Sequence, residues 1–205
     1  MDILQKSKTN QRRIGLTGGI ASGKTTITNY IRKHKNIPIL DADHVSRELI
    51  KPNTYGYKKI LDYFGNKIID NKNNSEKEIN RKLLRKIIFQ NSENKEWIEK
   101  LLHPLIKEKM IEECSQYKNN KTIVLVIPLL FEAKFEDICT EIWLVKCPKE
   151  TQKKRLIARD KISEKEAYES INLQLSFEEK RKFSDIILDN SDNQNKWVKT
   201  IRELL

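Results

Sequence analysis

Apolar and polar stretches alternate along the amino-terminal part of the chain. The short apolar run Arg13–Thr17 predicts a buried strand, and Thr25–Lys35 carries apolar residues at helical spacing. A second apolar run, Ile37–Leu40, predicts another strand and is followed by Asp41-Ala42-Asp43. A strand, a helix and a second strand in this order predict the beginning of a parallel α/β sheet.

The middle of the chain has a different pattern, because residues 44–118 show helical periodicity almost throughout. The expected helices are His44–Ile50, Tyr55–Phe64, Ile79–Phe89 and Glu93–Tyr117, with an exposed loop at Asp70–Glu78. A helical block of this length between two strands is an insertion that can cover a second substrate.

The carboxyl-terminal part returns to strands. Apolar runs at Thr122–Ile127, Glu141–Lys146 and Asp185–Leu188 predict three more, and Asn193–Leu205 predicts a closing helix. We therefore expect an α/β fold with a doubly wound, five-stranded parallel sheet and ligands at the carboxyl ends of its strands. In this view residues 12–205 form one domain, with a core of 12–43 and 119–205, an insert of 44–118 and a lid of about 149–183.

Composition excludes several classes of protein. Hydrophobic residues make up 38% of the chain and charged residues 34%, a polar but globular mixture. Residues 1–11 are polar and predict a disordered extension without the apolar core of a signal peptide, and no apolar run approaches the ~18 residues of a membrane span. Cys114, Cys139 and Cys147 form no C-x-x-C pair, so we expect reduced thiols in a cytoplasmic protein.

The net charge of +11 raises the question of an anionic partner. The excess is mostly lysine spread over every expected helix, which is typical of solvated faces and also follows from A/T-rich codons. We therefore expect no nucleic-acid or membrane partner, and a monomer or weak homo-oligomer.

The most informative motif is Gly18–Thr25, which reads G-x-x-x-x-G-K-[ST] between an expected strand and an expected helix. This is the pattern of a phosphate-binding loop, in which backbone N–H groups surround a β-phosphate. Lys24 then reaches the β- and γ-phosphates and the Thr25 hydroxyl ligates Mg²⁺. We expect ATP and Mg²⁺ to bind here. The binding residues would be Gly19, Ile20, Ala21, Ser22, Gly23, Lys24, Thr25 and Thr26.

Two carboxylates, Asp41 and Asp43, end the second strand at the same edge of the sheet as the loop. A carboxylate here can hold a Mg²⁺ shell through water or accept the proton of an attacking hydroxyl. Asp43 is equally suited to capping the helix expected from His44. Position alone leaves both interpretations open.

Other polar residues near this edge are ambiguous in the same way. Glu132 is the one member of the turn Pro128–Glu132 suited to touching a ligand, and the preceding strand lacks the magnesium-binding aspartate of many nucleotide hydrolases. Arg155 and Arg159 are spaced i, i+4 and share a helix face that either closes over the transferring phosphate or is merely solvated. His103 lies midway along an apolar helix face, where core and capping roles are common.

Taken in order, these motifs resemble dephospho-coenzyme A kinase over nearly the whole chain from about residue 12. The segments that carry the resemblance are Leu16–Thr25, Asp41–Asp43 with Arg47-Glu48, Arg81, Leu102–Pro104, Pro128–Glu132, Arg155 with Arg159-Asp160, Gln174 and Asp189-Asn190. The resemblance implies transfer of the ATP γ-phosphoryl group to the ribose 3′-hydroxyl of dephospho-CoA, the last step of coenzyme A synthesis.

The resemblance also implies roles for individual residues. Asp43 matches the family's general base, Arg155 and Arg159 match its lid, and Asn190 matches its adenine-side loop. Residues on the acceptor side would be Asp41, Arg47, Arg81, His103, Leu130 and Glu132. Lys77 departs from the family pattern, which usually has a glycine there.

Two other functions use the same parts. A kinase of another small molecule or nucleotide would share the loop, the insert and the lid. A P-loop switch or nucleic-acid-dependent ATPase would share the loop alone; Asp62–Gly65 mimics a D-x-x-G switch, but no N-K-x-D guanine reader occurs.

Overall fold

A computed structural model describes residues 6–7, 9–70, 77–191 and 194–205. The chain divides into two compact units, 1–41 with 113–205 and 42–112, which are described separately below. The insert expected from the sequence is 44–118. It therefore starts two residues later than the second unit and ends six residues later.

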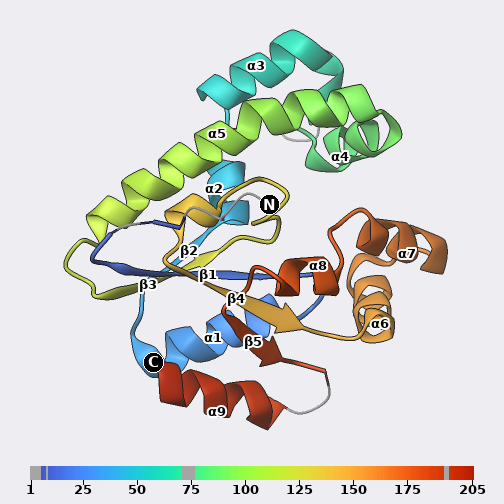
Figure 1. Ribbon diagram of the computed structural model, residues 1–205. Coiled ribbons are helices and arrows are strands. Elements are labelled where there is room, and N and C mark those ends of the chain that lie inside the picture. Colours follow the sequence, from blue (N-terminus) through green and yellow to red (C-terminus); the bar gives the residue numbers. More distant parts are fainter. Residues whose placement is uncertain (1–5, 8, 71–76, 192–193) are drawn as a thin grey trace. The chain divides into compact units, whose positions relative to one another are not determined.

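The first unit is built on a five-stranded parallel sheet (Figure 1). Its strands are β1 (Arg12–Gly18), β2 (Ile39–Asp41), β3 (Thr122–Val126), β4 (Glu141–Lys146) and β5 (Ile186–Asp189). They lie in the order β2-β3-β1-β4-β5, with β1 at the centre. Chain order reverses beside β1, so the end of β1 is the switch point at which such sheets bind ligands. The expected doubly wound sheet is confirmed.

One face of the sheet is covered by α1 (Lys24–Lys35) and α9 (Gln194–Leu204), seen beneath the strands in Figure 1. Ile27 and Ile31 from α1 and Trp197 and Ile201 from α9 are buried in one cluster with strand residues such as Leu16. The i, i+4 spacing of each helical pair puts both side chains on the face toward the sheet.

The central strand approaches its neighbours on the other face closely at Gly15. A Cβ added there would lie 2.6 Å from Cys139 Sγ and 2.8 Å from Leu130 Cδ1. Glycine is therefore needed at this position because the connection after β3 packs directly against the strand. Cys139 and Leu130 are both completely buried.

Three helices lie between β4 and β5: α6 (Lys149–Asp160), α7 (Glu164–Asn172) and α8 (Phe177–Arg181). Both α7 and α8 begin with capping boxes, Ser163 with Glu166 and Ser176 with Glu179. These reciprocal bonds satisfy the free N–H groups of each first turn and fix where the helices start. From the sequence we expect a lid here, with Arg155 and Arg159 on one helix face; the division into three helices comes from the structure.

The second unit is helical, with α2 (Ala42–Leu49), α3 (Tyr55–Phe64), the 3-10 helix η1 (Asn66–Ile68), α4 (Arg81–Gln90) and most of α5 (Ser92–Gln116). Its core contains Ile60, Phe64 and Ile98, and Trp97 stacks on Tyr63 with ring centroids 3.9 Å apart. Among the described residues, no helix is long and apolar enough to cross a membrane.

Part of the expected loop at Asp70–Glu78 and of the expected amino-terminal extension lies outside the described residues. The described residues of the extension make hydrogen bonds with other parts of the first unit, and disorder of residues 1–11 stays a prediction. Ser7 N donates to Cys139 O at 2.9 Å, and Gln11 Nε2 donates to Tyr117 O at 2.7 Å. Lys77, in the second unit, accepts a hydrogen bond at its backbone oxygen from the Tyr57 hydroxyl.

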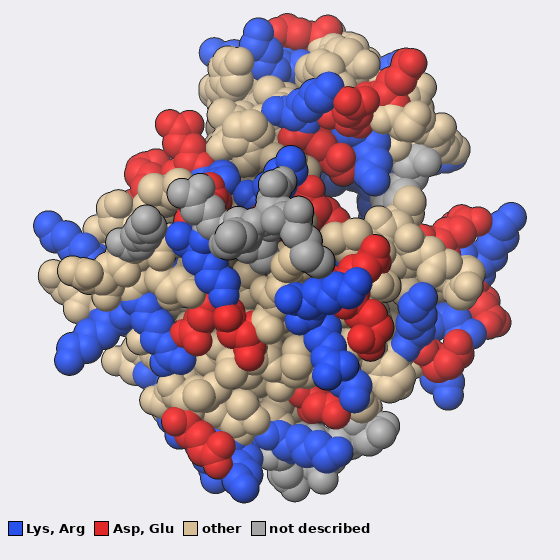
Figure 2. All heavy atoms as spheres, in the orientation of Figure 1, with Lys and Arg blue, Asp and Glu red and all other residues tan. Residues whose placement is uncertain are grey.

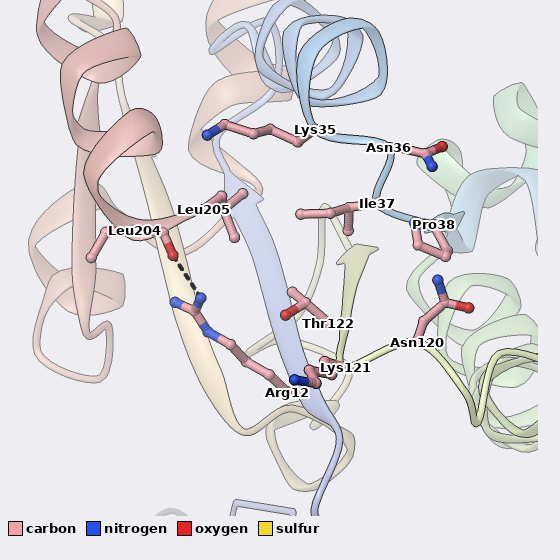
Figure 3. A pocket seen from close by; sticks show the side chains of 10 residues that line it. All are labelled: Arg12, Lys35, Asn36, Ile37, Pro38, Asn120, Lys121, Thr122, Leu204 and Leu205. Atoms are coloured by element: carbon pink, nitrogen blue, oxygen red, sulfur yellow. Dashed lines mark hydrogen bonds between the residues drawn. The ribbon is translucent and has the colours of Figure 1, made fainter.

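A pocket of about 300 Å³ lies at the amino ends of β1 and β3, the opposite end of the sheet from the carboxyl ends (Figure 3). Arg12 lines it, but its guanidinium already donates to Leu204 O at 2.7 Å and pairs with Glu141. This pocket is therefore separate from the edge of the sheet at which a nucleotide is expected.

We predict that Ile31→Ala lowers the free energy of unfolding by about 2–5 kcal/mol, because it leaves a cavity in the cluster under the sheet. Lys33→Ala, on the exposed face of the same helix, should change it by less than about 0.5 kcal/mol. Urea denaturation measures both. Equal effects of the two variants would contradict the packing described here.

Candidate nucleotide-binding site

The phosphate loop connects β1 to α1 at the switch point of the sheet. Gly23 precedes the helix in the left-handed conformation, with φ of 99°. A Cβ at Gly23 would lie 2.0 Å from Asn190 Nδ2. This position therefore requires glycine both for its backbone angle and for the close approach of Asn190.

The amino end of α1 favours an anion. No acidic residue lies in the first turn, and Arg32, Lys33, His34 and Lys35 occupy the last. Free N–H groups and the helix dipole give the first turn a partial positive charge. The amino end of α1 therefore favours binding of an anionic phosphate.

Peptide geometry fixes the direction of one loop amide. Asn190 Nδ2 donates to Ser22 O at 2.8 Å, and Arg155 donates to the same oxygen at 3.4 Å. The C=O and the following N–H point in opposite directions across a trans peptide. The Gly23 N–H therefore points away from Asn190 and Arg155.

Lys24 contacts the loop that precedes it. Its Nζ donates to Gly18 O at 2.7 Å and to Gly19 O at 3.1 Å. These bonds place the ammonium inside the curve of the loop, where phosphate oxygens would bind. Thr25 and Thr26 follow at the start of α1 and are exposed, so their hydroxyls are accessible to a ligand.

Side chains from the other half of the sheet pack on the loop. Gln152 lies over Gly19, where a Cβ would approach its Oε1 to 2.5 Å, and its Nε2 donates to Cys147 O at 2.8 Å. Asn190, just after β5, is buried. The structure thus brings Arg155 and Asn190 to the loop as well as the residues of the motif itself.

The tip of the loop is bound to the lid. Ile20 and Ala21 pack against a small core made by Leu156 of α6 and Ala167 and Ile171 of α7. Ile20 N donates to Gln174 Oε1 at 2.7 Å, in the connection between α7 and α8. The lid therefore contacts the phosphate loop through both apolar packing and a hydrogen bond.

The turn after β3 makes contacts within the protein that the sequence did not predict. Leu130 is completely buried against β1, so it supports the core and does not face solvent. Glu132 Oε1 accepts from Leu175 N at 3.0 Å and pairs with Lys180 Nζ at 2.8 Å. In this structure Glu132 therefore holds the lid.

The remaining residues expected in this unit lie nearby but make different contacts. Arg159 is exposed on α6 and pairs with Asp160 at 2.7 Å. Asp41 is exposed at the end of β2, aligned with Val126, which is itself aligned with Leu16 of β1. Because neighbouring strands lie about 4.8 Å apart, Asp41 Cα is about 10 Å from the central strand.

The other expected residues belong to the second unit. Asp43 is exposed in the first turn of α2, which begins at Ala42, so the structure does not make it the residue that caps a helix from His44. Arg47 and Arg81 are exposed near the end of α2 and the start of α4. Partial burial lowers the pKa of His103, against a smaller raising effect of the Glu99 carboxylate.

Three residues of the site were not singled out from the sequence: Gln152, Cys147 and Lys180. Gln152 and Lys180 act through contacts with segments distant in sequence, Gly19 and Glu132, which no local pattern reveals, and Cys147 accepts from Gln152 through its backbone oxygen. Gln174 is one of the residues that carry the family resemblance, but only the structure shows that its side chain accepts a hydrogen bond from Ile20 N. Within the described residues, no cluster of three or more His, Cys, Asp or Glu side chains is placed to hold a metal ion.

Comparisons with known proteins find similar proteins that match this chain over almost its full length. A family model described as dephospho-CoA kinase matches residues 12–196. A dephospho-CoA kinase of Prochlorococcus marinus (strain MIT 9312) is 87% identical over 205 residues, 100% of both chains. The solved dephospho-CoA kinase from Campylobacter jejuni is 29% identical, with a TM-score of 0.65 over 94% of this chain and 96% of that one. TT1252 from Thermus thermophilus is 26% identical, with a TM-score of 0.78 over 96% and 99%.

We predict that Gly23→Ala weakens ATP binding at least about tenfold, because the new Cβ would displace Asn190 and strain the backbone. Gly65→Ala is the matched control, since Gly65 also has a positive φ, 73°, but nothing lies within 4 Å of its Cβ position. Titration calorimetry with ATP measures both affinities. If Gly23→Ala binds ATP as tightly as Gly65→Ala, the close approach at the loop is not required for binding.

Proposed function

The chain belongs to the dephospho-CoA kinase family, and from this premise we propose that it transfers the γ-phosphoryl group of ATP to the ribose 3′-hydroxyl of dephospho-CoA, completing coenzyme A synthesis. The observation that carries the proposal is the phosphate loop with Lys24 inside its curve, at the switch point of the sheet. An alternative kinase with another acceptor would use the same loop, so the acceptor must be tested directly.

The loop supplies the binding of the phosphoryl donor. The first-turn N–H groups of α1, the Gly23 N–H and the Lys24 ammonium would surround the β- and γ-phosphates of ATP. Phosphoryl transfer passes through a loose transition state in which charge spreads over the equatorial and leaving oxygens. Fixed donors aimed at those oxygens lower the barrier more than a strong base does.

Asp43 is proposed as the general base, because it matches the family's aspartate and follows the end of β2 by two residues. Its position inside the first turn of α2 stabilises the carboxylate through the helix dipole. An ionised, exposed carboxylate can accept the proton of the 3′-hydroxyl as that oxygen attacks phosphorus. An ordinary basicity is sufficient for a loose transition state.

Arg155 and Arg159 are proposed to neutralise the transferring phosphoryl group from the lid. In this structure Arg155 donates to Ser22 O, on the side of that peptide opposite the Gly23 N–H, and would turn from there to reach the phosphate. Arg159 lies one turn further along α6 and would exchange its bond with Asp160 for a phosphate oxygen. Excluding water at this stage would prevent hydrolysis of ATP.

Magnesium is proposed as the cofactor, and the residues present fit it. Mg²⁺ prefers hard oxygen ligands and usually keeps several waters while binding substrate phosphates. The exposed Thr25 hydroxyl would be a direct ligand, and the Asp41 carboxylate, about two strand spacings away, would act through water. When bound, the ion would neutralise charge on the β- and γ-phosphates.

The acceptor is proposed to bind the helical unit. Arg47 and Arg81 are exposed and positively charged, which suits the pyrophosphate of dephospho-CoA. Partial burial lowers the pKa of His103 and so favours its neutral imidazole, which would act by hydrogen bonding. The structure suggests that Leu130 and Glu132 support the lid and the core; acceptor contact by either stays a prediction.

We place this reaction in the cytoplasm, since Cys114, Cys139 and Cys147 form no C-x-x-C pair and all three are buried. Nucleic acid is not proposed as a partner. On the face drawn in Figure 2, lysine and arginine side chains are interspersed with aspartate and glutamate. Such mixing is typical of a solvated surface. The monomeric or weakly associating state stays a prediction.

The proposal is tested by offering ATP with three acceptors: dephospho-CoA, AMP and shikimate. We expect turnover with dephospho-CoA and a product that gains one phosphoryl group at the 3′-position, identified by mass spectrometry and phosphorus NMR. Preferential phosphorylation of AMP or shikimate would assign the chain to another specificity. ATP hydrolysis stimulated by DNA or RNA would instead support a nucleic-acid-dependent ATPase.

We predict that Asp43→Asn lowers kcat by about 10²–10⁴-fold with little change in ATP affinity, because the amide cannot accept the proton. Asp62→Asn, an exposed residue on α3, serves as the control. Lys24→Ala should lower kcat to a similar degree and weaken ATP binding as well. Steady-state kinetics with a circular dichroism check of folding measures these effects. Near-normal turnover of Asp43→Asn would leave that residue with a structural role only.

A further inference from the structure

Two consecutive residues between α7 and α8 join separate parts of the site. Gln174 Oε1 accepts a hydrogen bond from Ile20 N in the phosphate loop at 2.7 Å. The next residue, Leu175, donates its backbone N–H to Glu132 Oε1 at 3.0 Å. This connection of the lid is therefore fixed to the loop after β1 and to the turn after β3.

We propose that Gln174 is a positioning residue that sets the conformation of the phosphate loop and, through it, the place of Lys24. The inference rests on the proposed function, because it concerns the loop that binds ATP. Gln174 acts through a single peptide group, the one that joins Gly19 to Ile20.

The geometry of that peptide explains the coupling. Its N–H is bound to Gln174, and its carbonyl oxygen, Gly19 O, accepts from Lys24 Nζ at 3.1 Å. The two groups point in opposite directions across a planar trans peptide. Rotating the peptide away from Gln174 would therefore remove one of the oxygens that hold the lysine. Gln174 and Lys24 stabilise the same peptide orientation from opposite sides.

The backbone next to Gln174 is held in place by a buried ion pair. Lys180 is 1% exposed, and its ammonium lies 2.8 Å from Glu132 Oε1, the oxygen that also accepts from Leu175 N. A buried charge separated from its partner is costly, so this pair resists opening. The backbone beside Gln174 is consequently fixed, and its side chain presents an acceptor at a defined point.

Apolar packing adds to the same arrangement. Ile20 and Ala21 contact the core formed by Leu156, Ala167 and Ile171. Ala21 has a positive φ of 57°, which is unfavourable for a residue with a side chain. The contacts made by the lid compensate for this strain and hold the tip of the loop in a form that it would leave if free.

The test compares Gln174→Met, which keeps the length of the side chain but has no oxygen acceptor, with Gln174→Glu, which restores one. Exchange of the Ile20 amide, measured by NMR without nucleotide, should be about fivefold faster in Gln174→Met and return toward the wild-type rate in Gln174→Glu. Titration calorimetry should show ATP binding about fivefold weaker in Gln174→Met, because the competent loop is less populated.

Asn172→Met, at the exposed end of α7, is the matched control and should leave the exchange rate and the ATP affinity unchanged. Gln174→Ala is a second variant without the acceptor in case Gln174→Met does not fold. Wild-type exchange and ATP affinity in a folded acceptor-less variant would overturn the proposal. Failure of the wild-type protein to bind ATP would instead contradict the proposed function, while the exchange measurement would still test the role of Gln174.

Discussion

The site depends on the orientation of a few peptide groups in the phosphate loop. A peptide is planar, so fixing one carbonyl oxygen also fixes the direction of the N–H on its other side. At the base of the loop, Asn190 and Arg155 hold Ser22 O, and at its tip Gln174 holds Ile20 N. At the base this keeps the Gly23 N–H aimed inward, and at the tip it keeps the Gly19 carbonyl oxygen turned toward Lys24, because side chains from later segments hold the opposite ends of the same peptides.

The sheet explains why those later segments are available. With β1 at the centre and β4 and β5 on one side, the residues that follow β4 and β5 end beside the loop. Gln152 and Arg155 come from the helix after β4, and Asn190 directly follows β5. Parallel strands place these carboxyl ends at one edge, so residues far apart in sequence meet there without any long loop.

Most of the fold was predictable from local patterns. Buried parallel strands are continuous apolar runs, and the Gly18–Thr25 motif carries its own requirement for a strand before it and a helix after it. Boundaries were less predictable where a polar residue continues an element. Asp41 ends β2 and α2 begins at Ala42, so Asp43 lies inside the helix, whereas a cap was one of the two interpretations that its position in the sequence left open.

What the sequence could not predict are partnerships between distant polar residues. No local pattern indicates that the Glu132 carboxylate binds Lys180 and the backbone of Leu175, while its contact with a ligand stays a prediction. Lys180 is buried, and nothing in the residues around it in the sequence indicates this. Such a pair forms only when two distant segments pack together, so neither segment's own sequence predicts it.

The two kinds of contact between lid and loop respond differently to temperature. Burial of Ile20 against Leu156 and Ile171 is a hydrophobic contact, and such contacts weaken on cooling. The hydrogen bond from Ile20 N to Gln174 does not depend on apolar hydration. In cold conditions this bond therefore carries a larger share of the attachment between lid and loop.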